Sequence, residues 1–329
     1  MAGIVTFDDR AVAQAVDVLR RGGLVAIPTE TVYGLAADAT NGEAVAGIFA
    51  VKGRPHFNPL IAHVSGLAMA ERHVTFDPIS HRLAEAFWPG PLTLVLPLKD
   101  RQETARQDAY RPVHPLTTAG LSTLAVRMPQ GRVRDVIAAL DRPVAAPSAN
   151  TSGRISPTSA EAVAGDLGDR LDLILDAGPC GVGVESTIVK VEGDRVRLLR
   201  PGGLAAEEIE ALIGRRLERA DQRAAIQAPG MMASHYAPVA GVRLNAETVA
   251  PGEALLAFGP KRAAGAEKAG AVLNLSPGGD LRAAAANLFD FMRRLDATGA
   301  KTIAVEPVPA TGLGEAINDR LRRAAAPRG

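Results

Sequence analysis

Short apolar runs with strand character alternate with segments of helical spacing along most of this 329-residue chain. Val12, Val16 and Leu19 recur at the spacing of one helical face, and two glycines then separate them from an apolar run at 24–28. Further strand-like runs lie at 59–64, 92–98, 124–129, 143–148 and 173–178, and further helix-like segments lie around 41–52, 80–87, 132–140 and 158–168. This alternation predicts an α/β domain built on a twisted mixed sheet.

The pattern changes in the last third of the chain. Residues 187–191 and 195–200 flank a Glu-Gly-Asp turn and predict a hairpin, and a helix-like segment follows at 205–214. Residues 215–241 have no sustained pattern and contain two prolines, which predicts a linker. Strand-like segments at 254–259, 271–276 and 302–308 then alternate with helix-like segments at 281–299 and 313–325, as in a small parallel sheet. We expect the basic C-terminal stretch at 320–329 to fray. The predicted division is a catalytic domain at 1–214, a linker at 215–241 and a second domain at 242–329.

Charge and cysteine content exclude several classes of protein. The 37 basic residues nearly cancel the 36 acidic ones, so the net charge of +1 gives no global attraction to nucleic acid. A single cysteine, Cys180, excludes an intrachain disulfide framework and a zinc site with several cysteines, and it suits a reducing cytosol. Asp8 and Asp9 stand where a signal peptide would be basic and then apolar, and no run of ~18 apolar residues occurs. We therefore expect a cytoplasmic protein with no membrane span.

Polar stretches at the ends of predicted strands are the candidates for chemistry, because α/β proteins build their sites there. They read PTETVYGL (28–35), KGRPHFNPLIAH (52–63), STLAVRMP (122–129), APSANTSGRISPT (146–158), GVESTIVK (183–190) and LLRPGG (198–203). The chain has neither GxxxxGK[ST] nor GxGxxG. A nucleotide would thus be bound without the common phosphate loops.

Each candidate residue also has an ordinary structural explanation. Lys52 and Arg54 could interact with the negative end of the preceding helix, and His63 could be a packed core histidine. The Thr, Ser and Asn residues could be turn or cap residues, Arg200 an edge-strand charge and Tyr236 a surface anchor. Arg127 is different, because a charged group inside an apolar strand needs an anionic partner.

Taken together, the candidates favour anion binding. Four cations, Lys52, Arg54, Arg127 and Arg200, accompany a series of hydroxyl and amide groups. The set includes no Asp or Glu cluster for a metal cage or an acid–base pair, and no GxSxG motif for a nucleophile. Positioning and charge neutralisation are how phosphoryl and nucleotidyl transfer are catalysed. We expect a nucleotide site beside a carboxylate-bearing substrate, without a protein metal site.

The motifs also carry a resemblance to a known family. PTETVYGL, KGRPHFNPLIAH, FWPGPLTLVLP, APSANTSGRISPT, GVESTI, LLRPGG and PGMMASHYAP occur in the order typical of the YrdC/Sua5 family. They span about residues 12–240, and the remainder is similar in length and pattern to the C-terminal domain of the two-domain Sua5 type. The resemblance implies a YrdC-like catalytic domain followed by a small Rossmann-like parallel α/β domain.

The resemblance further implies L-threonylcarbamoyladenylate synthase activity, a nucleotidyltransferase reaction. L-threonine and bicarbonate would form a carbamate that attacks ATP, giving threonylcarbamoyl-AMP and pyrophosphate for t6A modification of adenosine 37 in tRNAs reading codons that begin with A. Mg²⁺ would accompany ATP with phosphate and water ligands. A downstream tRNA threonylcarbamoyl transferase would use the product, and no stable nucleic-acid binding would be required of this chain.

Carried over by motif position, the resemblance assigns two sets of residues. The L-threonine set is Thr31, His63, Arg127, Ser148 and Ser186. The ATP set is Lys52, Arg54, Asn58, Thr123, Asn150, Thr158, Arg200 and Tyr236, of which Lys52 and Arg54 are the catalytic candidates. The linker around Tyr236 would fold over the nucleotide as a lid.

Two alternatives remain open from the sequence. An RNA-binding module could use the same cationic concavity, although it would need wider basic stripes or aromatic platforms, and aromatics are 4% of this chain. A carbamoyl transferase of the hydrogenase-maturation kind shares the catalytic domain type. That class normally has zinc-binding cysteine clusters, for which a chain with one cysteine has no residues.

Overall fold

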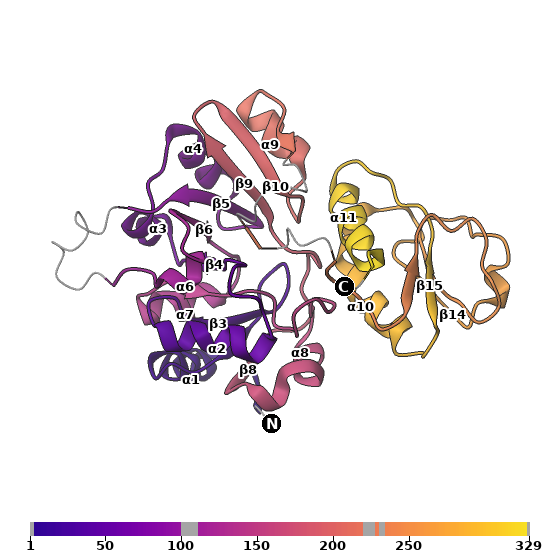
Figure 1. Cartoon of the computed structure of the whole chain (residues 1–329), viewed down its shortest axis with the longest axis horizontal. Coiled ribbons are helices and arrows are strands. Elements are labelled where there is room, and N and C mark those ends of the chain that lie inside the picture. The colour runs from indigo at the N-terminus through magenta and orange to yellow at the C-terminus, as the bar shows by residue number, and fades with distance from the viewer. Residues whose placement is uncertain (1–2, 100–110, 220–227, 230–233, 328–329) are drawn as a thin grey trace.

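The computed structural model describes residues 3–99, 111–219, 228–229 and 234–327. These residues form two bodies, each built on its own β-sheet (Figure 1). The larger body contains an 11-stranded sheet, and the smaller one, coloured orange to yellow in Figure 1, contains a four-stranded sheet. The predicted α/β fold class is confirmed.

The large sheet has the strand order β1-β8-β2-β3-β7-β4-β6-β5-β9-β10-β11. Its strands are β1 (Gly3–Thr6), β2 (Val25–Ile27), β3 (Gly34–Asp38), β4 (Ile61–His63), β5 (Leu92–Pro97), β6 (Thr123–Arg127), β7 (Val144–Ala145), β8 (Leu173–Asp176), β9 (Thr187–Glu192), β10 (Arg195–Arg200) and β11 (Glu218–Arg219). The pairing is mixed: β4 and β6 run parallel, whereas β5 and β6 run antiparallel. In the parallel pair His63 is in register with Arg127, so two candidate site residues lie side by side at the ends of their strands.

Helices pack against this sheet through their buried apolar residues. They are α1 (Asp9–Arg20), α2 (Gly42–Lys52), α3 (Leu67–His73), α4 (Pro78–Phe87), α6 (Pro115–Thr118), α7 (Val133–Leu140), α8 (Ala160–Leu167) and α9 (Ala206–Ile213), with a 3-10 turn at Gly168–Arg170. Side-chain caps fix where several helices begin. Asn41 Oδ1, for example, accepts hydrogen bonds from Glu43 N (3.0 Å) and Ala44 N (3.3 Å) at the start of α2. The cap thereby fixes the start of α2, whose last residue is Lys52.

The smaller sheet has the order β12-β15-β13-β14, and its neighbouring strands pair in parallel. Its elements are β12 (Gly241–Arg243), β13 (Ala254–Ala257), a 3-10 turn (Ala266–Lys268), β14 (Ala271–Asn274), α10 (Leu281–Asp296), β15 (Thr302–Val305) and α11 (Leu313–Ala325). Figure 1 shows α10 and α11 on the side of this sheet that faces the larger body. The predicted small parallel α/β unit is confirmed.

The two bodies share a hydrophobic cluster. Val32, Ile155 and Val184 of the larger body pack in the same cluster as Leu288 and Phe289 of α10. The backbones also approach closely at Gly183, which has φ 77°. A Cβ atom at this position would lie 2.3 Å from Ala285 O, so only glycine permits this contact.

Several local predictions are confirmed and one is wrong. The hairpin appears as β9 and β10, and the helix-like segments at 132–140, 205–214 and 281–299 appear as α7, α9 and α10. Strands β1, β3 and β12 and helices α3 and α6 were not predicted. The expected fraying at 320–329 is incorrect up to Ala325, because α11 continues to that residue and buries Arg320 completely. Within the predicted linker, β11 pairs with β10 of the large sheet.

Candidate active site

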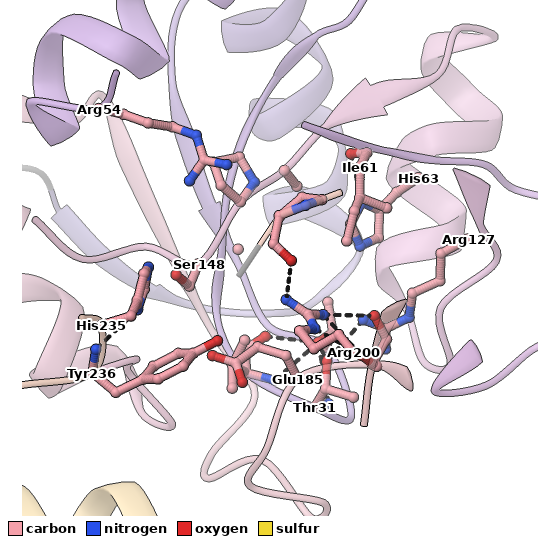
Figure 2. A pocket seen from close by; sticks show the side chains of 17 residues that line it. Thr31, Arg54, Ile61, His63, Arg127, Ser148, Glu185, Arg200, His235 and Tyr236 are labelled. Atoms are coloured by element: carbon pink, nitrogen blue, oxygen red, sulfur yellow. Dashed lines mark hydrogen bonds between the residues drawn. The ribbon is translucent and has the colours of Figure 1, made fainter. Parts of the chain in front are cut away.

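One cavity gathers most of the candidate residues. It has an empty volume of about 530 Å³, and its walls come from segments that are far apart in the sequence (Figure 2). The lining residues are Thr29, Thr31, Val32, Gly34, Arg54, Ile61, His63, Arg127, Ala146, Pro147, Ser148, Glu185, Ser186, Arg200, Pro229, His235 and Tyr236. Residues of both predicted sets therefore share one cavity.

The structure brings together all five residues expected for L-threonine, but only part of the ATP set. Thr31, His63, Arg127, Ser148 and Ser186 all line the cavity. From the ATP set, Arg54, Arg200 and Tyr236 line it. The others lie outside the lining described above: Lys52, Asn58, Thr123, Asn150 and Thr158.

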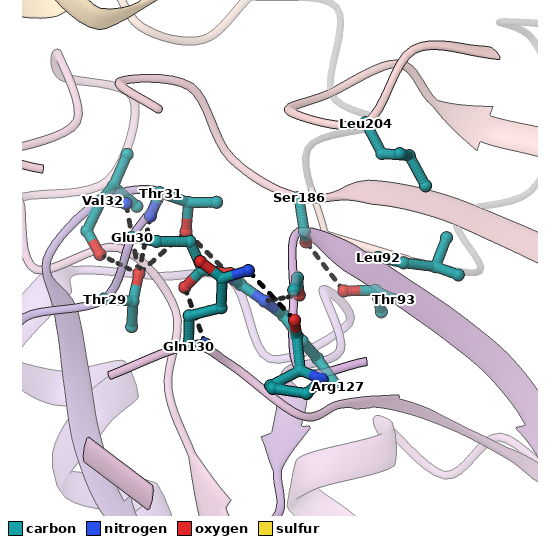
Figure 3. A network of polar contacts seen from close by, with 12 residues as sticks. Thr29, Glu30, Thr31, Val32, Leu92, Thr93, Arg127, Gln130, Ser186 and Leu204 are labelled. Carbon is teal, nitrogen blue, oxygen red and sulfur yellow. Dashed lines mark hydrogen bonds and ion pairs between the residues drawn. The ribbon is translucent and has the colours of Figure 1, made fainter. Parts of the chain in front are cut away.

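Arg127, at the end of β6, is held by three partners (Figure 3). Its Nη2 lies 2.7 Å from Glu30 Oε1, its Nη1 donates to Thr31 Oγ1 (2.9 Å), and its Nε donates to Gly90 O (3.2 Å). Glu30 also accepts a hydrogen bond from Gln130 N (3.1 Å) through Oε2. The anionic partner that the sequence required for Arg127 is therefore present inside the protein, in the neighbouring loop.

The threonine hydroxyls beside Arg127 form a directed chain. The Thr29 hydroxyl donates to Val32 O (2.7 Å) and lies 2.8 Å from the Thr31 hydroxyl. A hydroxyl carries a single proton, so Thr31 is the donor in its contact with Thr29 and an acceptor from Arg127. This chain fixes the orientation of the Thr31 side chain at the cavity wall.

His63 is buried and uncharged at physiological pH. Only 3% of it is exposed, and its Nδ1 lies 3.3 Å from Ile61 O. Burial, together with the nearby Arg127 charge, lowers the pKa of His63 to about 3. The ring can therefore make hydrogen bonds to a ligand but does not add a positive charge.

Ser186 and Arg200 form a second polar group in the cavity. Ser186 Oγ lies 2.7 Å from Thr93 Oγ1 (Figure 3). Arg200 Nη2 donates to Ser186 O (2.8 Å). Gly202 permits a close approach of its backbone to that of Ser186, because a Cβ atom at position 202 would lie 2.3 Å from the Ser186 carbonyl carbon. Burial lowers the pKa of Arg200, yet a guanidinium remains charged at neutral pH.

The two catalytic candidates differ in their surroundings. Arg54 lines the cavity, and its guanidinium donates to Asn58 O (3.1 Å) and Pro59 O (2.8 Å) of its own loop. Burial lowers the pKa of Arg54 to about 10. Lys52 is 2% exposed, and its Nζ donates to Ser148 O (2.5 Å) and Asn150 O. These contacts do not support the alternative that Lys52 caps its own helix, because both acceptors lie in the loop after β7.

The remaining ATP candidates are placed around this loop or further away. Asn150 donates from Nδ2 to Thr151 O (2.7 Å) and Arg154 O (3.0 Å), and Thr158 O accepts from Cys180 N (2.9 Å). Asn58 is fully buried beside Arg54. Thr123 begins β6, four residues before Arg127, and so lies at the opposite end of that strand.

Sequence reasoning missed Glu30, Glu185 and His235, although all three lie inside the quoted motifs. Burial alone would raise the pKa of Glu185, but the charges of Arg320 and Arg200 and a hydrogen bond from Ser156 outweigh it and lower the pKa to about 2. His235 is 7% exposed, and burial lowers its pKa to about 3. The signal available was that Glu30 and Glu185 each stand next to a hydroxyl residue, in a set of motifs whose other polar residues are mainly cations, hydroxyls and amides.

No group of three or more His, Cys, Asp or Glu side chains is arranged to hold a metal ion in the part of the chain that the structure describes. Among the same residues, no helix combines the length and apolar character needed to cross a membrane.

Known proteins resemble this chain over nearly its full length. A family model described as telomere recombination, Sua5_yciO_yrdC, matches residues 17–202, and one described as the C-terminal domain of threonylcarbamoyl-AMP synthase, Sua5_C, matches residues 204–326. The threonylcarbamoyl-AMP synthase of Bacillus subtilis (strain 168) is 40% identical over 337 residues, which cover 98% of this chain and 94% of that protein. That of Pyrococcus abyssi (strain GE5 / Orsay) is also 40% identical, over 94% of this chain and 92% of its own.

A solved structure agrees in fold. The crystal structure of P. abyssi Sua5 complexed with L-threonine is 36% identical, with a TM-score of 0.85, and the match covers 99% of this chain and 97% of that one. The resemblance found in the motifs is thus confirmed in both halves. The chain belongs to the Sua5/YciO/YrdC family and is of its two-domain Sua5 type.

Proposed function

We propose that this chain is a threonylcarbamoyl-AMP synthase, which converts L-threonine, bicarbonate and ATP into threonylcarbamoyl-AMP and pyrophosphate. The observation that best supports this function is the composition of one cavity. His63 and Ser186, expected for L-threonine, line it together with Arg54, Arg200 and Tyr236, expected for ATP. A carboxylate and a triphosphate would both meet cationic side chains there.

In the L-threonine half, Arg127 would bind the substrate carboxylate. Its Nε and Nη1 donate hydrogen bonds to Gly90 and Thr31, whereas its buried Nη2 lies in an ion pair with Glu30 and makes no hydrogen bond within the described residues. The N–H groups of Nη2 are therefore available to a ligand. The neutral His63 ring and the hydroxyls of Thr31, Ser148 and Ser186 would form hydrogen bonds with the nitrogen and the side-chain hydroxyl of the substrate.

The reaction proceeds in two steps in this proposal. The amine nitrogen of L-threonine bonds to the bicarbonate carbon and water leaves, which gives a carbamate. A carbamate oxygen then attacks the α-phosphorus of ATP, the bond from that phosphorus to the bridging oxygen breaks, and pyrophosphate departs with the electron pair. Arg54 and Arg200 offset the charge that develops on pyrophosphate. Holding the carbamate against the α-phosphate in a closed cavity provides most of the acceleration through effective molarity.

Mg²⁺ is part of the proposal as the companion of ATP, where it would offset charge on the phosphates. Glu185 is the one carboxylate among the described lining residues. Its two oxygens accept hydrogen bonds from Ser156 (2.5 Å) and Arg320 (2.7 Å). The ion would therefore take its ligands from phosphate and water rather than from a protein cage.

The domain roles are also proposed. Residues 1–214 form the catalytic domain, 215–241 a linker that covers the nucleotide, and 242–329 the C-terminal domain. The position of Tyr236 in the cavity wall supports the covering role. Residues 220–227 and 230–233 of the proposed lid lie outside the described residues.

The product would serve t6A modification of adenosine 37 in tRNA. A separate tRNA threonylcarbamoyl transferase would consume it, so this chain itself needs no stable complex with nucleic acid. A cytoplasmic location accords with the use of ATP and with the single, buried cysteine thiol of Cys180.

Pyrophosphate release by the purified chain tests the function. ATP and Mg²⁺ are supplied with L-threonine and bicarbonate, and each of the last two is omitted in turn. We expect release only when both are present, with an AMP adduct of threonylcarbamate detected by mass spectrometry. No release under any combination, together with RNA binding by the cationic cavity, would instead support the nucleic-acid module.

A further inference from the structure

One buried arginine of the C-terminal domain reaches the wall of the cavity. Arg320, on α11, is 0% exposed although it is a charged residue on a terminal helix. We propose that Arg320 is a positioning residue of the nucleotide site, which holds Glu185 and the Tyr236 ring in place and so makes the C-terminal domain part of the active site. This inference rests on the proposed synthase function and adds to it a role for the second domain.

The contacts of Arg320 cross from one body to the other. Its Nε donates to Glu185 Oε2 (2.7 Å), and its Nη1 donates to Pro201 O (3.0 Å), both in the larger body. On its own helix, Nη1 also donates to Asp319 Oδ2 (2.7 Å). A guanidinium held by three acceptors in this way has a fixed plane.

Glu185 is the first group whose position depends on the orientation of the Arg320 guanidinium. It lines the cavity directly before Ser186, and its other oxygen accepts a hydrogen bond from Ser156 (2.5 Å). The Arg200 charge also acts on Glu185 and, after that of Arg320, lowers its pKa. Without Arg320, Glu185 would be a buried anion whose nearest strong cation is Arg200, the residue proposed to offset phosphate charge.

Tyr236 is the second group. The Arg320 guanidinium carbon lies 5.1 Å from the centroid of the Tyr236 ring, within the range of a cation–π contact. Phe289 of α10 stacks on the same ring, with centroids 5.4 Å apart. The backbone next to it is also fixed from α11, because His235 N donates to Arg323 O (3.2 Å). The C-terminal domain thus sets the position of the aromatic wall of the cavity.

The expected consequence is a selective loss of nucleotide binding. In Arg320→Met, the Glu185 carboxylate loses its cationic partner and should attract the Arg200 guanidinium instead. The Tyr236 ring also loses its cation–π contact. The KM for ATP should rise about tenfold, while the KM for L-threonine should change less than about threefold. Arg320→Lys, which keeps the charge but not the planar fork, should recover part of the loss.

A matched control exists on the same helix. Glu315 pairs with Arg219 of β11 (3.1 Å), so this ion pair also joins the two bodies, but neither residue lines the cavity. Glu315→Gln should leave both KM values unchanged, even if it lowers the thermal midpoint. A second comparison is the double variant Glu185→Gln/Arg320→Met. Removing the stranded charge should restore ATP binding toward that of Glu185→Gln alone.

Three outcomes would overturn the inference. These are equal rises in both KM values, changes in Arg320→Met that match those in Glu315→Gln, or no recovery in the double variant. Should the wild-type chain release no pyrophosphate, the synthase function fails independently. The role of Arg320 would then be read from calorimetric binding of α,β-methylene-ATP to the wild type, Arg320→Lys and Glu315→Gln. Equal affinities would reject it, and a loss confined to Arg320→Lys would support it.

Discussion

At the scale of single residues, the site consists of buried charges whose partners come from distant segments. Arg127 and Glu30 lie far apart in the sequence, but their Nη2 and Oε1 atoms are 2.7 Å apart. A buried ion pair contributes little net stability, because desolvation of both groups offsets their attraction. Its value here lies in orientation: Glu30 and Thr31 fix the guanidinium plane, so that its remaining N–H groups point in defined directions.

Arg127→Lys tests this residue. A lysine ammonium has three donors and no planar fork, so it cannot keep the contacts with Glu30, Thr31 and Gly90 and also bind a substrate carboxylate through two N–H groups. We expect the KM for L-threonine to rise about tenfold or more, equivalent to ~1.4 kcal/mol, and the KM for ATP to change less than about twofold. Arg132→Lys is the control, since Arg132 is exposed and pairs with Asp9 outside the cavity. Equal effects on both substrates would count against the assignment.

At the scale of elements, the C-terminal end of α2 is tied to the loop that follows β7. Lys52, the last residue of α2, donates to the carbonyl groups of Ser148 and Asn150. Burial lowers the pKa of Lys52 well below its usual range, and the Arg54 charge lowers it further. Lys52 is therefore placed to hold a loop that contributes Ser148 to the cavity, whereas its motif position had indicated contact with phosphate.

Lys52→Met separates these two roles. It leaves two buried carbonyl groups without their donor, which should cost about 1–3 kcal/mol of folding stability and lower the thermal midpoint. If Lys52 acts through the loop, the KM for L-threonine should rise along with the KM for ATP, because Ser148 belongs to the L-threonine set. A rise in the KM for ATP alone would instead support direct contact between Lys52 and phosphate.

At the scale of the whole molecule, buried neutral histidines make stability depend on pH. Burial lowers the pKa of His63 and His235 to about 3 and that of His73 to about 4, and the charges of Arg72 and Lys99 also lower the pKa of His73. The unfolded chain, with histidine pKa values near 6.5, thus binds more protons between these limits. Stability is full above pH ~6.5 and falls as the pH decreases below it.

His73→Gln checks the sign and size of this effect at a residue outside the cavity. The wild type should lose stability between pH 7.5 and 5.5, with each buried histidine contributing about 1 kcal/mol of that loss. The variant should lose about 1 kcal/mol less, seen as a smaller drop in thermal midpoint of roughly 2 °C. The exposed His56→Gln provides the comparison. Identical pH dependence in the wild type and His73→Gln would contradict the prediction.

The sequence by itself determined two kinds of feature: elements set by residues close together in the chain, and the family, which the order of the motifs indicates. Periodicity predicted the β9–β10 hairpin and helices such as α7 and α10, because apolar spacing and turn residues act within a few positions. The order of the motifs indicated the family and the residues of the L-threonine set. The short strand β3, with the sequence GLAAD, has no such local signal, and pairing with β2 and β7 makes it a strand.

Only the tertiary structure decided which charges meet. Sequence spacing says nothing about a contact between Glu185 and Arg320, which are 135 positions apart, or about the Glu30 partner of Arg127. For the same reason the basic C-terminal stretch looked solvated, although packing of α11 against the larger body buries Arg320. Burial raises the cost of an unpaired charge, so the folded chain selects these long-range pairs, and the pairs in turn fix the cavity.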